Sequence, residues 1–207
     1  MFYIATTRFN NDTWKENCNY KNKNGIEGVI YGTNIRIRCS HSLGSLFFVI
    51  EMNNQTNKIE GIGLIRNQLV LDKRYNIYSI GDYNRYIYKG NYWLSRDKLY
   101  YYDKELVDIF ETILFKGKGH FKRQSGISVV SSLLFEKWEY DEEIIRNDLK
   151  NIFIKEFYND NGNYNGSVNE SVNESVRVTE DITDLSIKED EYEYVYINNT
   201  NNNIKAN

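Results

Sequence analysis

The sequence contains no proline, only two cysteines and no long run of apolar residues. Cys18 and Cys39 lack the CxxC spacing of zinc and redox sites, so we expect free thiols in a reducing compartment and no bound metal. No stretch approaches the 18 apolar residues that indicate a transmembrane helix. The first residues also lack the basic start and long apolar core of a signal peptide. These absences predict an intracellular, cytoplasmic protein that does not enter a membrane.

Recognisable catalytic motifs are missing as well. The sequence has no HExxH, no nucleophile elbow, no paired histidines and no GxxxxGK[ST] phosphate loop. Glu51 and Glu60, with Lys58 near them, are the best candidates for a metal-dependent nuclease site. Such carboxylates are also common as ordinary cross-strand charges, and His41 has no acid or cysteine beside it. We therefore predict a non-enzymatic protein without a cofactor and keep the nuclease as a minor alternative.

Charge is distributed unevenly along the chain. Residues 1–158 carry 23 Lys and Arg against 19 Asp and Glu, whereas residues 159–207 carry 3 against 10. The net charge of −3 thus combines a body of +4 with a tail of −7. A cationic body permits a polyanionic partner, and low hydrophobicity with net negative charge predicts disorder in the Asn-rich tail. The expected organisation is one folded domain over 1–158 and a disordered acidic tail over 159–207.

Residues 45–67, SLFFVIEMNNQTNKIEGIGLIRN, form the clearest structural pattern. An apolar, β-prone run over 46–50 is followed by Asn-rich turn chemistry and by a second apolar run over 59–65. Gly61 and Gly63 in the second run predict a β-bulge or a close backbone approach. An isolated hairpin is only marginally stable, so other elements must pack against this one.

The segments around the hairpin predict an α+β fold. Short strands are expected over 2–7, 28–32, 35–38 and 127–130, and helices over 11–23, from Asp97 or Asp103 to 115, and over 141–158. Gly25 is placed to end the first of these helices. The predicted architecture is a small mixed β-barrel packed by about three helices.

Two stretches combine aromatic or glycine residues with positive charge. Residues 75–96, YNIYSIGDYNRYIYKGNYWLSR, interleave aromatic and basic side chains, as single-stranded nucleic-acid binders do. Strands also favour tyrosine, so these aromatics could instead pack within a barrel wall. Residues 115–128, FKGKGHFKRQSGIS, form either a glycine-rich phosphate-binding loop or a solvated basic turn. The candidate contact residues are Tyr83, Arg85, Tyr86, Trp93, Lys116, Lys118, Lys122 and Arg123.

The order of elements resembles the PUA-like superfamily, which includes the YTH, EVE and ASCH domains. The resemblance covers about residues 1–130: a strand, a helix bearing Trp14, a Val-Ile-Tyr-Gly strand and a hairpin ending in Gly-Ile-Gly-Leu-Ile. It implies that Tyr31 is the first aromatic of a base cage, at a position where the family often has Trp. The second cage aromatic would be Tyr83, Tyr86 or Trp93. The resemblance implies nucleotide binding, including a modified base, and no catalysis.

Three functions therefore remain open. The first is a nucleic-acid-binding module that reads a modified or unpaired base, with RNA favoured. The second is an interaction or structural protein that binds another protein, for which an abundance of tyrosine is typical. The abundant Asn, Tyr, Ile and Lys have A/T-rich codons, which are typical of the genome of a large DNA virus or a protist. Under this second function, the protein would be a viral interaction or structural factor. The third is the nuclease.

Overall fold

The computed structural model describes residues 2–38, 40–117 and 125–157. The chain divides into two units, Met1–Leu149 and Lys150–Asn207, and of the second unit only residues 150–157 are described. Cys39 and the tail predicted over 159–207 lie outside the described residues. Within the described ranges, no helix has the length and apolar character needed to cross a lipid bilayer.

The first unit contains two β-sheets. The five-stranded sheet has the order β6-β4-β3-β1-β7, with β1 parallel to β3 and all other neighbours antiparallel. The second sheet pairs β2 with β5 in antiparallel fashion. The strands are β1 (Phe2–Phe9), β2 (Val29–Thr33), β3 (Leu46–Asn53), β4 (Lys58–Arg66), β5 (Tyr86–Gly90), β6 (Tyr92–Ser95) and β7 (Ser128–Val129).

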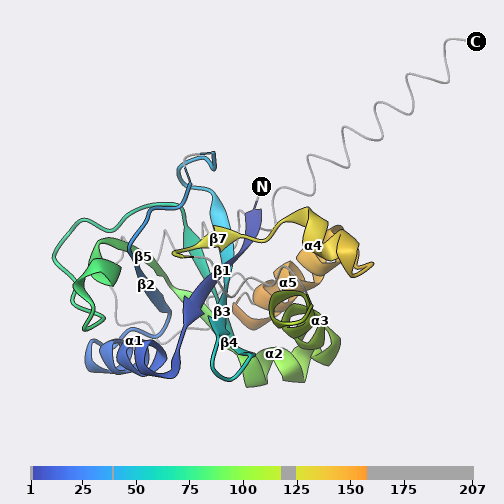
Figure 1. Ribbon diagram of the computed structural model, residues 1–207, viewed down its shortest axis with the longest axis horizontal. Coiled ribbons are helices and arrows are strands. Elements are labelled where there is room, and N and C mark those ends of the chain that lie inside the picture. The colour runs from blue at the N-terminus through green and yellow to red at the C-terminus, as the bar shows by residue number, and fades with distance from the viewer. Residues whose placement is uncertain (1, 39, 118–124, 158–207) are drawn as a thin grey trace, which may run out of the picture. The chain divides into compact units, whose positions relative to one another are not determined.

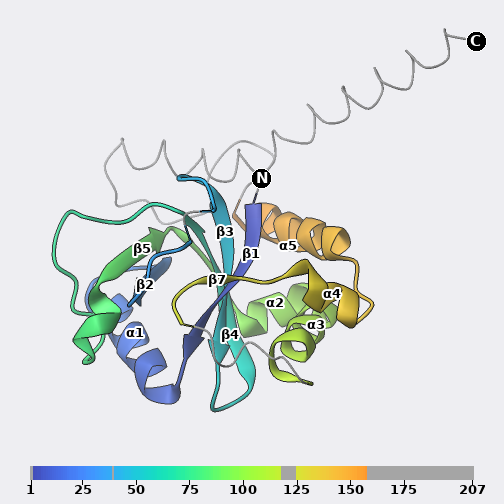
Figure 2. The same cartoon turned by 45° about the horizontal axis from the view of Figure 1, so that its top comes forward.

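Helices lie on both sides of the larger sheet. The two-stranded sheet and α1 lie on one side, and α2, α3 and α4 lie on the other (Figures 1 and 2). The protein is therefore α+β, as predicted, but the described residues form more helices than the three expected. They are α1 (Asn11–Lys23), α2 (Arg96–Tyr102), α3 (Lys104–Phe115), α4 (Ser132–Lys137) and α5 (Glu142–Phe157), with a short 3-10 turn, η1 (Gly81–Asn84).

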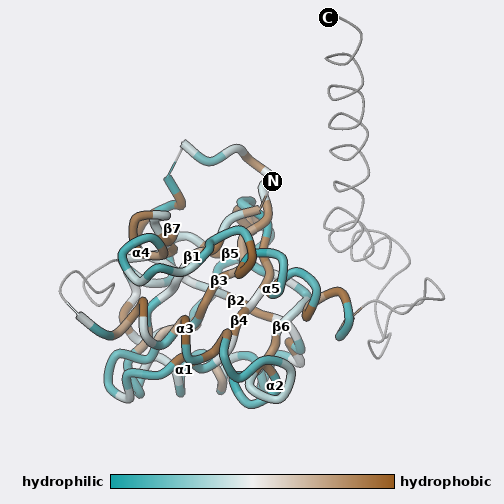
Figure 3. Tube along the Cα trace, turned by 90° about the vertical axis from the view of Figure 1, so that its right-hand side faces the viewer, coloured by the Kyte–Doolittle hydropathy of each residue, from teal (hydrophilic) through white to brown (hydrophobic). Residues whose placement is uncertain are grey.

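The predicted hairpin is confirmed as β3 and β4, at the centre of the large sheet. All eight residues of β3 are buried, because the strand is covered on both faces. Phe47 and Val49 belong to the core between the large sheet and the β2–β5 sheet. In Figure 3 the hydrophobic, brown stretches concentrate on the central strands and the hydrophilic, teal ones on the periphery.

Side-chain caps fix the ends of α1. Its N-cap is Asn10, whereas the sequence predicts Asn11 or Asp12, and the Asn10 side chain accepts from the Thr13 backbone N–H at 2.8 Å. Gly25 follows the C-cap with φ of 62°, which confirms its predicted role. The Asn11 backbone N–H also donates to Gln55 Oε1, at 2.7 Å, in the β3–β4 turn. These bonds hold α1 against the sheet.

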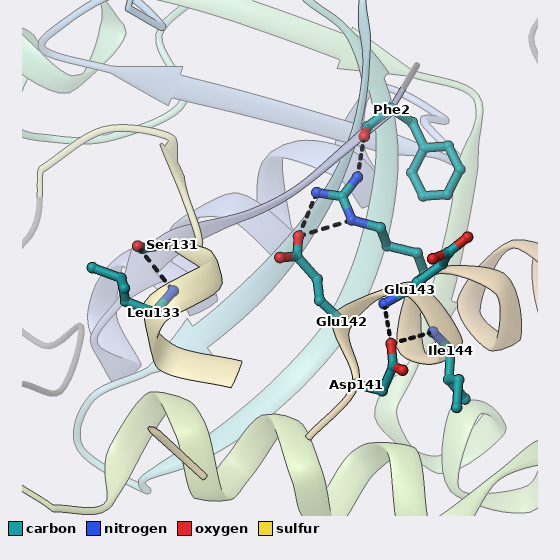
Figure 4. A network of polar contacts seen from close by, with 8 residues as sticks. Phe2, Ser131, Leu133, Asp141, Glu142, Glu143 and Ile144 are labelled. Atoms are coloured by element: carbon teal, nitrogen blue, oxygen red, sulfur yellow. Dashed lines mark hydrogen bonds and ion pairs between the residues drawn. The ribbon is translucent and has the colours of Figure 1, made fainter. Parts of the chain in front are cut away.

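The start of α5 is joined to the start of β1. The Arg146 guanidinium donates to the Phe2 carbonyl at 2.5 Å and, through Nε, to Glu142 Oε1 at 2.8 Å (Figure 4). Asp141 caps the helix by accepting from the Glu143 backbone N–H at 2.8 Å, and Ser131 caps α4. Asp141 was the predicted start of this helix, whereas α4 was not predicted.

The predicted strand over 35–38 and the aromatic stretch over 75–96 take other forms. Residues 35–38 pair with no strand of the described chain; instead, the Ile37 backbone N–H donates to the Tyr88 hydroxyl at 2.9 Å. Ile37 is buried while Arg36 and Arg38 are exposed, but Ile35 is also 48% exposed, so the alternation holds only over 36–38. Residues 75–96 form an irregular segment followed by η1, β5 and β6. Both segments supply residues that line the cavities described next.

Candidate functional site

A cavity of about 280 Å³ lies where β1 and β2 end and α1 begins. We call it the aromatic pocket, because the rings of Tyr78 and Tyr83 meet edge to face in its wall, with centroids 6.1 Å apart. Thr7 and Asn34 add polar groups, and Arg8 adds a positive charge. The remaining lining residues are Phe9, Asn10, Thr13, Gly32, Thr33, Asn54, Ile80, Ser125 and Gly126. Such a mixture of ring faces and polar groups suits a flat heterocycle.

The Asn84 side chain shapes the tyrosine wall. Its Oδ1 accepts from the backbone N–H groups of Ile77 and Tyr78, both at 2.9 Å, and its Nδ2 donates to the Tyr78 carbonyl at 2.7 Å. The irregular segment thereby gains the hydrogen bonds that a strand would otherwise supply. The Tyr78 hydroxyl accepts from Asn17 Nδ2 at 3.1 Å, and burial raises the pKa of Tyr78. The Tyr78 side chain is therefore held in place and stays uncharged.

Next to this pocket lies a second cavity of about 500 Å³, which we call the basic groove. Arg36, Arg38 and His41 line it together with three serines, and no described lining residue carries a carboxylate. The guanidinium of Arg36 lies 5.0 Å from the ring centroid of Tyr86, which restrains it by a cation–π contact. The serines are Ser125, Ser128 and Ser131, and apolar residues complete the lining.

The structure distributes the sequence-predicted residues over several places. Tyr83 lines the aromatic pocket, and Tyr86 lies beneath Arg36 at the basic groove. Arg85 instead forms an exposed ion pair with Asp82 at 2.8 Å. Lys116 lines a third cavity, of about 530 Å³, that also contains Asp108 and Glu111. Three further candidates lie outside the described residues: Lys118, Lys122 and Arg123.

Tyr78, Arg36 and Arg38 are candidate site residues that the sequence patterns did not indicate. The alternating Ile-Arg-Ile-Arg pattern over 35–38 was the one signal available for the two arginines. It predicts a half-buried strand there; both arginines are exposed and line the groove, but of the two isoleucines only Ile37 is buried. Tyr78 lies within the aromatic and basic stretch over 75–96, but nothing local distinguishes it there, because its position also depends on Asn17, 61 residues earlier.

Tyr31 and Trp93 belong to a buried group around Glu51. Glu51 is 1% exposed on β3, and its carboxylate accepts from the Tyr31 hydroxyl at 2.9 Å and from Trp93 Nε1 at 2.8 Å. The ammonium of Lys21, on α1, lies 4.2 Å from the Trp93 ring centroid. These four residues are called the Glu51 cluster below. Since Tyr31 is only 1% exposed, its ring presents no open face to a base.

A β-bulge makes room for this cluster. Glu51 pairs with Gly61 and Met52 pairs with Ile59, so Glu60 is the extra residue of β4. A Cβ on Gly61 would lie 2.7 Å from Trp93 Nε1, and only glycine lets the indole reach Glu51. The bulge and close approach predicted from the glycines are thus confirmed. The bulge and the close approach allow the hydrogen bond between Trp93 and Glu51 inside the protein.

The electrostatics of the Glu51 cluster favour a proton on Glu51. Burial raises the pKa of Glu51 to about 7, although Lys21, Trp93 and Tyr31 all act to lower it. Burial lowers the pKa of Lys21, and the nearby Glu51 opposes that shift. The Glu60 side chain accepts from Asn53 Nδ2 at 2.7 Å. Within the part of the chain that the structure describes, no three His, Cys, Asp or Glu residues gather as metal ligands would.

Comparisons of the chain with protein-family models, with curated proteins and with solved structures find no match. Function must therefore be argued from the pocket, the groove and the cluster themselves.

Proposed function

We propose that the protein binds single-stranded nucleic acid and holds one unpaired base in the aromatic pocket. The observation that carries this proposal is the pocket itself, in which Tyr78 and Tyr83 form a wall beside polar side chains. Its volume of about 280 Å³ is at the lower limit of small-molecule sites, which span roughly 300–1,000 Å³. A single base suits this size better than a larger ligand.

Polar groups in the pocket match the needs of a base edge. The amide of Asn34 offers both a donor and an acceptor, and the Thr7 hydroxyl offers either. Proteins that read single-stranded RNA combine such contacts with stacking on aromatic rings. Phe9 and Ile80 supply apolar lining, against which a methyl group on a modified base would pack. RNA remains the favoured ligand in this proposal.

We also propose a PUA-like architecture and a location in the cytoplasm. We infer that the two sheets correspond to the two halves of a small PUA-like barrel. The β2–β5 sheet approaches β4 so closely that a Cβ on Gly90 would overlap the Leu64 carbonyl. Cys18 is a free thiol, as proteins of the reducing cytoplasm usually have.

Replacing Tyr83 with alanine is expected to weaken binding of a labelled single-stranded oligonucleotide by about 5- to 150-fold. This range follows from the ~1–3 kcal/mol that one stacked base contributes. Fluorescence anisotropy of the full-length protein with RNA and DNA, with and without a methylated base, measures the effect. Tyr101→Ala is the matched control, because Tyr101 is 85% exposed on α2 and lines none of the cavities described above.

Equal affinity for the natural protein and the Tyr83→Ala variant would contradict the proposal, provided that circular dichroism shows both to be folded. Loss of binding in the Tyr101→Ala variant alone would place the contact on α2. Tyr100 and Tyr101 are neighbouring exposed aromatic residues on α2, and such residues are enriched where proteins bind one another. A contact there would therefore favour the second function, binding to another protein. A protein complex that survives nuclease treatment would support this second function.

A further inference from the structure

The basic groove holds two arginines in a fixed arrangement. Between Arg36 and Arg38, Ile37 is buried and its backbone N–H is bound by the Tyr88 hydroxyl. This anchor turns both neighbouring side chains toward the groove, which both of them line. Within the described residues, neither guanidinium pairs with a carboxylate. Two cations are thus presented together without a described counter-ion.

The groove also offers hydroxyl donors. Ser125, Ser128 and Ser131 line it, and serine hydroxyls and arginine side chains are common partners of phosphate oxygens. The Ser128 hydroxyl already donates to the Ser125 carbonyl at 3.5 Å, whereas the Ser131 oxygen accepts from the Leu133 backbone N–H and its O–H can still donate. Arginine binds phosphate through two parallel N–H donors. The combined lining therefore fits a phosphate group better than a neutral ligand.

The basic groove and the aromatic pocket share a wall. Ser125 lines both, Asn34 and Gly126 line the pocket, and the residues that follow them, Ile35 and Ile127, line the groove. The two wall segments touch, because a Cβ on Gly126 would lie 2.8 Å from Ile35 Cγ1. A ligand that extends from the pocket by one unit therefore enters the groove.

We propose that the basic groove binds the phosphodiester backbone adjoining the base in the aromatic pocket. This inference rests on the proposed function and narrows it: the ligand is a nucleic-acid strand, rather than a free base or nucleoside. Arg36 and Arg38 each contact a phosphate, while Tyr83 contacts the base. Phosphate contacts in the groove make the affinity depend on salt. Base contacts in the pocket contribute affinity that salt changes little.

The test measures binding of a labelled single-stranded RNA to the full-length protein at several salt concentrations. For single strands, the slope of log K against log salt is about −0.7 per phosphate contact. The Arg36→Gln/Arg38→Gln variant is therefore expected to reduce the magnitude of the slope by about 1.4. Lys23→Gln/Lys104→Gln is the control with an equal loss of charge, since neither lysine lines a cavity described above.

The outcomes separate this inference from the proposed function. A smaller slope in the arginine variant, with the slope of the lysine control unchanged, supports the groove. The same slope in both double variants overturns it, even if Tyr83→Ala still weakens binding and so supports the pocket. If the arginine variant alone lowers the slope but Tyr83→Ala binds normally, the groove binds phosphates and the base-binding proposal fails.

Discussion

Replacing Gly63 with alanine is expected to lower the free energy of unfolding by about 2–3 kcal/mol, at the upper end of overpacking effects. Its Cβ would lie 2.5 Å from Cγ1 and 2.9 Å from Cγ2 of Val29, and would overlap the hydroxyl of Tyr31. Both neighbours are at most 1% exposed, so neither has space to move away. A displaced Tyr31 also loses its hydrogen bond to the buried Glu51, which adds to the cost.

Gly81→Ala is the matched control for this substitution. Gly81 lies in η1, its φ is not positive and no atom lies within 4 Å of its Cβ position. Its replacement is expected to leave stability unchanged or to raise it by ~0.4–1 kcal/mol, through reduced entropy of the unfolded chain. Urea unfolding followed by tryptophan fluorescence measures both variants. Equal stability of the two would show that β2 does not pack against β4 at Gly63.

Stability is expected to fall by about 2–3 kcal/mol between pH 5 and pH 8 because of Glu51. Burial raises the pKa of this carboxyl from 4.5 to about 7, so the folded protein retains a proton that the unfolded chain releases. The resulting stabilisation is complete below pH 4.5 and is lost as the pH rises through 7. Lys21, whose pKa burial lowers, acts in the opposite sense as the pH approaches its ordinary value of 10.5.

A Glu51→Gln variant isolates this effect. Glutamine does not titrate, its carbonyl can accept from Trp93 Nε1, and its amide can donate to the Tyr31 hydroxyl, which can also act as an acceptor. All other titratable groups are common to the two proteins. Urea unfolding at several pH values is therefore expected to show a flatter pH dependence for the variant. If both proteins lose the same stability between pH 5 and pH 8, Glu51 is not the group responsible.

Local sequence signals predicted the elements that depend on local physics. The β3–β4 hairpin follows from two apolar runs, an Asn-rich turn and two glycines. The glycines also predicted a bulge or a close approach in β4, and the bulge lies at Glu60. The stop of α1 at Gly25 and the start of α3 after Asp103 follow from capping preferences. Each of these features is determined by residues close together in the chain.

Features that depend on distant residues were not predicted. The parallel pairing of β1 with β3 and the separation of β2 and β5 into their own sheet have no local signature. The role of Trp93 is also non-local, because an aromatic residue in a strand gives no sign that a carboxylate 42 residues earlier accepts its N–H. The resemblance placed Tyr31 in a base cage, but a strand pattern cannot show which ring face another sheet will cover.

The position of β1 has a consequence for synthesis of the protein. This apolar strand emerges from the ribosome before any described strand that pairs with it. Its parallel partner β3 follows about 40 residues later, and its other edge is covered at Ala5 and Thr6 by β7, more than 120 residues later. At ~5–20 residues per second, the nascent chain carries unpaired backbone groups on β1 for several seconds. Chaperone binding to β1 during translation is therefore expected to affect the yield of folded protein more than binding to the finished chain.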